Sequence, residues 1–266
     1  MKHMIALAVL AALAGPALAQ EQGGYEGRGP LAVRNTQAGP GCFFFHPAGK
    51  SDVPYPVILW GNGTNTMAAI YSPMLGQWAS HGFIVAAATT GAAGTGQEML
   101  GCLDYLAKEN RRDGGVFKGA VDLAHVGAAG HSQGGTGAIM AGRDPRVVAT
   151  APIQPYTIGA KYEAGAEAKQ HGPMLLLSGG ADHVADPARN QAPVFDGSNV
   201  PVVWATLNGA GHSTPSTRDS GGYRAATTAW FLWQLKGDVT AAEMFRGDRC
   251  GYCTDPGWTI RKKDTE

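Results

Sequence analysis

The chain has 266 residues, 44% of them apolar, and its 21 basic and 21 acidic side chains give a formal net charge of zero. This balance excludes an intrinsically disordered chain, which would be more charged and less apolar. Since there is no excess of basic residues, we expect neither a nucleic-acid partner nor attraction to an anionic membrane surface. The length is enough for one large α/β domain with a sizeable core.

Residues 1–19 have the features of a secretory signal peptide. A short, positively charged start precedes an apolar run over 4–14, and Ala17 and Ala19 form a small-x-small cleavage pattern. The run is too short to cross a bilayer, which takes about 20 residues. We therefore expect a secreted protein, extracellular or periplasmic, with no membrane anchor, in which residues 20–266 form a single domain.

Export permits disulfides between the four cysteines. Four cysteines allow three connectivities. The short spacing of Cys250 and Cys253 favours a tight loop between them, which leaves Cys42 to pair with Cys102. Because the C-x-x-C motif lacks a second pair of ligands at metal spacing, it gives little reason to expect zinc. We expect no metal and no cofactor.

The apolar pattern predicts strands and helices that alternate along the chain. Residues 20–40 show little periodicity and are interpreted as an N-terminal arm. Short apolar runs predict strands, whereas apolar side chains three and four residues apart predict helices. In chain order these are a strand at 55–60, a helix at 68–81, a strand at 83–88, a helix at 95–109, a strand at 125–129, a helix at 134–143, strands at 147–153, 174–178 and 201–207, and a helix at 222–236.

Strands that alternate with helices indicate an α/β fold with a mostly parallel central sheet and helices on both of its faces. In the helix at 68–81, Tyr71 falls on the apolar face. About twenty residues separate the strands at 147–153 and 174–178, which leaves room for one helix and a loop. No lid domain is therefore expected.

The most informative motif is Gly130-His131-Ser132-Gln133-Gly134, which has the form G-x-S-x-G. It follows a predicted strand and precedes a predicted helix, where this motif forms a sharp turn that projects the serine oxygen above the sheet. The helix N-terminus there offers unpaired backbone N–H groups to an oxyanion. The motif alone also fits a glycine-rich turn, but its position favours Ser132 as a nucleophile.

A serine hydroxyl needs a base, and in this architecture the chain order is serine, acid, histidine. Asp182 follows the strand at 174–178, and His212 follows the strand at 201–207. Of the eight histidines, His212 is the one placed where a base is required. Asp182 would hold the tautomer of His212, and Asp186 on the same loop is the alternative acid.

A second oxyanion donor should come from the loop after the strand at 55–60. Glycines in this loop let its backbone approach a ligand. We assign one donating N–H to Gly63, with Thr64 as the alternative, and the other to Gln133. The triplet that begins at Asn62 also matches a glycosylation sequon, which we interpret as accidental because a glycan would block the site.

Three residues are predicted to contact the substrate. Tyr156 follows the strand at 147–153 and is placed to form one wall of an acyl pocket, although a packed surface tyrosine fits the pattern nearly as well. His131 occupies the variable position of the serine motif and is expected to border the cleft. Thr64 lies next to the assigned oxyanion donor.

Between residues 56 and 235 the sequence resembles the secreted bacterial polyester hydrolases, the cutinase and poly(ethylene terephthalate) hydrolase group. The resemblance rests on the order and spacing of short segments: ASHGFIV at 79–85, VDLAHVG at 121–127, GHSQGG at 130–135, AP at 151–152, Asp182 with Pro187, and GHS at 211–213. It implies the α/β-hydrolase fold and a lidless serine esterase with an open surface groove. It also implies that Ser132, Asp182 and His212 form the catalytic triad.

The sequence departs from this family at the expected site. The family usually has an aromatic residue that donates from the oxyanion loop, where this chain has Gly63. The stretch 60–64 is more similar to chlorophyllase-related hydrolases. Gln133 stands where the family usually has a methionine, and Tyr156 stands where it usually has a tryptophan beside the substrate. The family's C-terminal disulfide also spans more residues than the one expected here.

We therefore expect a monomeric, secreted serine hydrolase that forms an acyl-enzyme on bulky apolar esters such as polyester or cutin. Its expected binding partner is the ester substrate itself, which can be polymeric. The first alternative is an esterase of small esters, lipids or acyl carbohydrates. The second, from a different functional class, is a non-catalytic protein that binds a ligand in the cleft where an enzyme of this fold holds its substrate. A serine, an aspartate and a histidine in the required order argue against the second.

Overall fold

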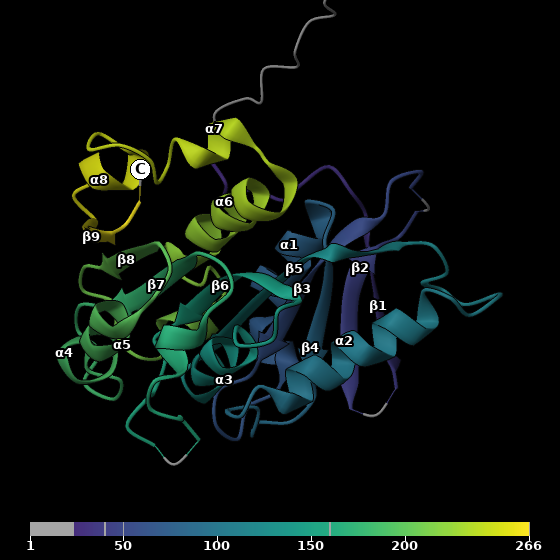
Figure 1. The fold of residues 1–266 in the computed structure, drawn as a ribbon. Helices are drawn as coiled ribbons and strands as arrows, with labels where there is room; N and C mark the ends of the chain where they lie inside the picture. The colour runs from purple at the N-terminus through teal and green to yellow at the C-terminus, as the bar shows by residue number, and fades with distance from the viewer. Residues whose placement is uncertain (1–23, 40, 50, 160, 266) are drawn as a thin grey trace, which may run out of the picture.

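The protein is described by a computed structural model that covers residues 24–39, 41–49, 51–159 and 161–265 (Figure 1). The predicted signal peptide at 1–19 lies outside the described residues. Within them, one sheet has the strand order β1-β2-β4-β3-β5-β6-β7-β8-β9. Its strands are β1 (Val33–Ala38), β2 (Cys42–Pro47), β3 (Tyr55–Gly61), β4 (Ile84–Ala88), β5 (Val121–His131), β6 (Val147–Ile153), β7 (Met174–Gly179), β8 (Val202–Leu207) and β9 (Trp258–Lys263).

Helices follow most of these strands. The α-helices are α1 (Ser72–Ser80), α2 (Gln97–Glu109), α3 (Gln133–Ala141), α4 (Pro187–Asn190), α5 (Ala192–Gly197), α6 (Tyr223–Lys236), α7 (Val239–Ala242) and α8 (Gly251–Thr254). The 3-10 helices are η1 (Ala68–Tyr71), η2 (Ala166–Lys169) and η3 (Thr214–Ser216). In the described part of the chain, none of these helices has the length and apolarity needed to cross a bilayer.

The sheet is parallel in its interior and antiparallel at its edges. Every neighbouring pair from β4 through β3, β5, β6 and β7 to β8 is parallel. Strands β1 and β2 at one edge and β9 at the other pair antiparallel. This arrangement confirms the predicted α/β-hydrolase fold with a mostly parallel central sheet.

Helices cover both faces of the sheet, as the alternation of strands and helices predicted. Along β3, Ile58 and Trp60 pack into the core shared with α1 and α6, while Val57 and Leu59 pack into the core shared with α2 and α3. Successive side chains of a strand point to opposite faces, so a fully buried strand must be apolar at every position. Figure 1 shows α1 and α6 on one side of the sheet and α2 and α3 on the other.

One sequence-based expectation differs from the structure, and one segment that the sequence left open is resolved by it. The segment interpreted as an N-terminal arm contains β1, an edge strand whose mixed polar sequence gives no periodic signal and whose regular structure comes from its ladder with β2. In the segment between β6 and β7, whose length left room for a helix and a loop, the described residues form the short η2. Proline and glycine are frequent between 155 and 173 and interrupt a longer helix.

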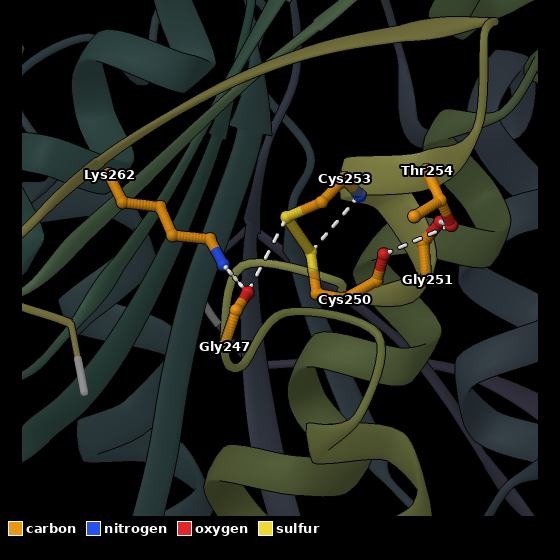
Figure 2. Close-up of a disulfide and its surroundings, with 6 residues drawn as sticks. All are labelled: Gly247, Cys250, Gly251, Cys253, Thr254 and Lys262. Carbon is orange, nitrogen blue, oxygen red and sulfur yellow. Dashed lines mark hydrogen bonds between the residues drawn. A yellow bond between two sulfur atoms is a disulfide. The ribbon is translucent and has the colours of Figure 1, made fainter.

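Both disulfides have the connectivity favoured by the sequence. Cys42 of β2 pairs with Cys102 of α2, which joins the sheet to the helix layer. Cys250 pairs with Cys253 at the start of α8. Figure 2 shows the second bond beside Gly247, whose carbonyl oxygen lies 3.7 Å from Cys253 Sγ and accepts a hydrogen bond of 2.6 Å from Lys262 Nζ. The hydrogen bond from Lys262 thereby connects the loop at Gly247, just before α8, to strand β9.

We predict that the two disulfides contribute unequally to stability. The loops they close differ in length, because the sequence separations are 60 and 3 residues. In the chain-entropy account, the long loop contributes about 4 kcal/mol and the short loop about 2 kcal/mol. Urea unfolding should therefore show a larger loss of unfolding free energy for Cys42→Ala/Cys102→Ala than for Cys250→Ala/Cys253→Ala. Equal losses would contradict this ranking.

Candidate active site

The turn between β5 and α3 holds Ser132 in a strained conformation. Its φ is +55° and its ψ is −117°, outside the regions that residues with a side chain normally occupy. Such a conformation costs about 1–3 kcal/mol and persists only where the surroundings impose it. The strained turn directs the chain from the end of β5 straight into α3, as a G-x-S-x-G turn requires.

Close backbone contacts impose this turn. Gly61 at the end of β3 pairs with Gly130 of β5 in the parallel ladder. A Cβ on Gly130 would lie 2.2 Å from the Gly134 carbonyl oxygen, and a Cβ on Gly134 would lie 2.0 Å from the Gly61 carbonyl oxygen. No side chain fits at either position. The loop after β3 therefore lies directly against the start of α3.

Ser132, His212 and Asp182 form a hydrogen-bonded row. Ser132 Oγ lies 2.9 Å from His212 Nε2, and His212 Nδ1 lies 2.8 Å from Asp182 Oδ2. With the carboxylate ionised, His212 donates its Nδ1–H to Asp182, which leaves Nε2 free to accept the serine proton. Ser132 and Asp182 are buried, whereas the His212 side chain is 18% exposed.

The Asp182 carboxylate is held in place from both sides. Its Oδ1 accepts backbone N–H groups from Val184 and Ala185 at 2.9 and 2.8 Å. Burial by itself raises the pKa of Asp182, but the hydrogen bonds from His212 and from the two N–H groups outweigh burial, so the pKa lies below its usual value. Asp186 instead caps α4 by accepting the Arg189 N–H at 3.1 Å.

Three backbone N–H groups beside Ser132 are available to a ligand. Gly63 and Thr64 line the groove that contains Ser132, and Gln133 is the first residue of α3. Within the described residues, no hydrogen bond uses the N–H of Gly63, Thr64 or Gln133. Unpaired donors at a helix N-terminus and in a neighbouring loop are suited to hold a negative oxygen.

The glycosylation sequon has no accessible acceptor. The Asn62 side chain is fully buried. Its Nδ2 donates to the carbonyl oxygens of Ala88 and Thr90 at 2.7 and 3.1 Å, and its Oδ1 accepts the Trp60 indole N–H at 2.9 Å. Asn62 therefore joins the end of β3 to the end of β4.

The groove around Ser132 has a volume of about 430 Å³ and lies at the carboxyl end of the parallel strands. Tyr156 and Val184 both line it and are 37% and 58% exposed. The Tyr156 N–H donates to the Ser132 carbonyl oxygen at 3.1 Å, which fixes this residue beside the turn. Tyr156 is thus a wall of the groove rather than a packed surface residue.

His131 lines the groove but is almost completely buried, at 5% exposure. Its Nδ1 lies 2.8 Å from the Tyr71 hydroxyl, and its Nε2 lies 2.9 Å from the His212 carbonyl oxygen. Burial, and then repulsion from His212, lowers the pKa of His131 to about 3. The ring is therefore neutral at ordinary pH.

Sequence reasoning missed the part that Tyr71 has in this site. Helical spacing indicated only an apolar position, and Tyr71 is indeed buried at 1% exposure. The available signal was chemical, because a buried tyrosine hydroxyl needs a hydrogen-bond partner. For metals, the described residues contain no cluster of three histidine, cysteine, aspartate or glutamate side chains able to hold an ion.

Two comparisons show which known proteins the sequence is similar to. The sequence pattern of the family described as "PETase: PET hydrolase-like" matches residues 23–244. The chain is also 24% identical, over 208 residues, to a protein of Streptomyces coelicolor (strain ATCC BAA-471 / A3(2) / M145) named bis(hydroxyethyl) terephthalate hydrolase. That match covers 73% of this chain and 64% of the relative, so the chain spans slightly less than two thirds of the relative's length.

We predict that His131 makes the protein less stable in mild acid. Its pKa is about 3 in the folded protein and about 6.5 in the unfolded chain, so between these values only the unfolded state takes up the proton. The free energy of unfolding should therefore fall as the pH drops from 6.5 towards 3, by about 2 kcal/mol at pH 4.5 from this residue.

Urea unfolding at pH 7 and pH 4.5 checks this prediction. His131→Gln should lose less stability between the two pH values than the wild type. His183→Gln, at an exposed position, should lose as much as the wild type. Equal losses in all three proteins would show that His131 does not cause the acid sensitivity.

Proposed function

Because the chain belongs to the PET hydrolase-like family, we propose that it is a secreted serine hydrolase that cleaves carboxylic esters, including aromatic polyesters, through an acyl-enzyme. The observation that carries the proposal is the hydrogen-bonded row of Ser132, His212 and Asp182 at the bottom of an open groove. A strained serine turn at the start of a helix is the setting in which this chemistry occurs on the α/β-hydrolase fold.

In the first half of the reaction, Ser132 Oγ attacks the ester carbonyl carbon while His212 Nε2 takes its proton. Asp182 stabilises the imidazolium that forms. The carbonyl oxygen becomes an oxyanion, held by the N–H of Gln133 and by that of Gly63 or Thr64. When the tetrahedral intermediate collapses, the carbon–oxygen bond to the alcohol breaks. His212 donates its proton to the leaving alkoxide, and the acyl group stays on Ser132.

In the second half, water takes the place of the departed alcohol. His212 accepts a proton from the water, whose oxygen attacks the acyl carbon, and the same N–H groups hold the second oxyanion. Collapse breaks the bond to Ser132 Oγ and releases the carboxylic acid, and His212 returns the proton to the serine. Net consumption is one ester and one water, and no cofactor is needed.

The composition of the groove supports an uncharged substrate. Its lining contains no aspartate, glutamate, lysine or arginine among the described residues. Exposed apolar atoms of Tyr156 and Val184 stand on its rim, where they can contact an aromatic or aliphatic ester. The relative's name specifies bis(hydroxyethyl) terephthalate, an uncharged aromatic diester, and we extend that substrate class to this chain.

Two features support secretion. The sequence of residues 1–19 has the signal-peptide pattern. In addition, all four cysteines are paired in disulfides, which persist in oxidising compartments. We propose that the protein acts outside the cytoplasm, where an insoluble polymer is accessible.

We predict that substitutions of the two neighbouring aspartates have very different effects. On a short-chain p-nitrophenyl ester, Ser132→Ala should be inactive, and Asp182→Asn should lower kcat by about 10³- to 10⁴-fold because the amide no longer fixes the His212 tautomer. Asp186→Asn is the matched control and should stay within about twofold, since it only weakens a helix cap. A large loss in Asp186→Asn with an active Asp182→Asn would overturn the assignment.

The substrate class needs its own measurement. We predict that the wild type, but not Ser132→Ala, hydrolyses bis(hydroxyethyl) terephthalate and releases soluble aromatic acids from a poly(ethylene terephthalate) film, quantified by liquid chromatography. Activity on the p-nitrophenyl ester alone would identify an esterase of small esters instead. Inactivity on every ester would leave a non-catalytic binding protein.

A further inference from the structure

The mechanism above makes no use of two buried polar side chains beneath the groove. Tyr71 and His131 are 1% and 5% exposed, and the Tyr71 hydroxyl lies 2.8 Å from His131 Nδ1. Burying two polar groups is unfavourable unless each is paired. A phenylalanine and an apolar residue would fill the same space without this requirement, so the hydrogen bonds themselves need an explanation.

The hydrogen-bond partners of His131 determine which of its two ring nitrogens carries the hydrogen. The His212 carbonyl oxygen, 2.9 Å from His131 Nε2, can only accept, so Nε2 carries the hydrogen. Since the ring is neutral, Nδ1 has no hydrogen and must accept from the Tyr71 O–H. A continuous chain of donors therefore runs from the Tyr71 hydroxyl through His131 to the backbone of His212.

This chain ends at the base of the proposed triad. His131 holds the carbonyl of His212, and the centres of the two imidazole rings are 4.8 Å apart. The Gln154 side chain donates to the preceding carbonyl, that of Gly211, at 3.0 Å. Two buried donors thus fix the backbone from which the His212 side chain must reach Ser132.

The other end of the chain lies against the oxyanion loop. Thr66 donates its hydroxyl to the Gly63 carbonyl at 2.8 Å, and its Oγ1 lies 3.4 Å from the Tyr71 hydroxyl. A Cβ on Gly63 would lie 2.9 Å from that hydroxyl and 3.3 Å from His131 Nδ1. The Tyr71–His131 pair therefore occupies the space below Gly63 and supports the loop from beneath.

We propose that Tyr71 and His131 are positioning residues that join the oxyanion loop to the His212 loop and hold His212 in line with Ser132. The proposal rests on the proposed function, because positioning matters only if His212 is the base. Neutrality of His131 is part of the arrangement, since a cation 4.8 Å from the His212 ring would oppose the imidazolium formed during the reaction.

Substitutions that remove one hydrogen bond at a time test the proposal. Tyr71→Phe removes only the hydroxyl. His131→Gln keeps an N–H where Nε2 reaches the His212 carbonyl, whereas His131→Asn keeps only an acceptor near Tyr71. Tyr162→Phe is the control, because its hydroxyl bonds Glu167 away from the groove. Thermal midpoints of all variants show that each is folded under the assay conditions.

On a short p-nitrophenyl ester, we expect Tyr71→Phe to lower kcat by about 5- to 20-fold with KM changed less than about twofold. His131→Asn should lower kcat more than His131→Gln, because only the glutamine still holds the His212 carbonyl. The double variant Tyr71→Phe/His131→Gln should be no worse than about the poorer single variant, since both interrupt one chain. Tyr71→Phe and His131→Asn with wild-type kcat would overturn the proposal.

A spectroscopic measurement separates this proposal from the proposed function. In ¹⁵N-labelled wild-type protein, NMR should show His131 protonated at Nε2 only, together with a downfield signal from the His212 Nδ1–H bonded to Asp182. Exchange with water should broaden that downfield signal in Tyr71→Phe and His131→Asn but not in Tyr162→Phe. Protonation of His131 at Nδ1, or an unchanged His212 signal in both variants, would overturn the positioning role even if no ester were hydrolysed.

Discussion

The site depends on the contact between the backbones of Gly61, Gly130 and Gly134. The ends of β3 and β5 lie side by side in the parallel sheet, and α3 starts directly on top of them. A single Cβ at Gly130 or Gly134 would separate these segments. The contact holds Ser132 in its strained turn and brings the loop after β3, with Gly63 and Thr64, beside the serine. Geometry that the backbone imposes in this way needs no reorganisation when a substrate binds.

Electrostatically, the site has one buried charge and a neutral surrounding. Asp182 is ionised and accepts three hydrogen bonds, one of them from His212, so its negative charge lies next to the His212 ring. The ring of His131 lies 4.8 Å from that of His212 and is kept neutral by burial. An imidazolium at His212 would therefore meet the Asp182 carboxylate and no competing cation at His131. This arrangement favours the proton transfer from Ser132 on which the proposed ester cleavage depends.

Membership of the PET hydrolase-like family does not determine how this chain builds the loop after β3, which holds the proposed oxyanion donor. In place of an aromatic residue the loop has Gly63, and the volume beneath it is taken by the hydroxyl of Tyr71 and the ring of His131. Exposed apolar surface at the groove comes from Tyr156 and Val184.

The sequence by itself determined the layered α/β fold, the serine turn and the order in which an acid and a histidine follow it. These features are local, because apolar periodicity reflects burial on each face, and the glycines of a tight turn occupy fixed positions around the serine. Only the tertiary structure shows how the two aspartates after β7 differ, because Asp182 bonds His212 whereas Asp186 caps α4. It also showed that β1 and β9 are strands, because edge strands acquire regular structure from their ladder partners. The partnership of Tyr71 with His131 spans 60 residues, and no local pattern specifies a hydrogen bond between side chains that only the packing of η1 against the sheet brings together.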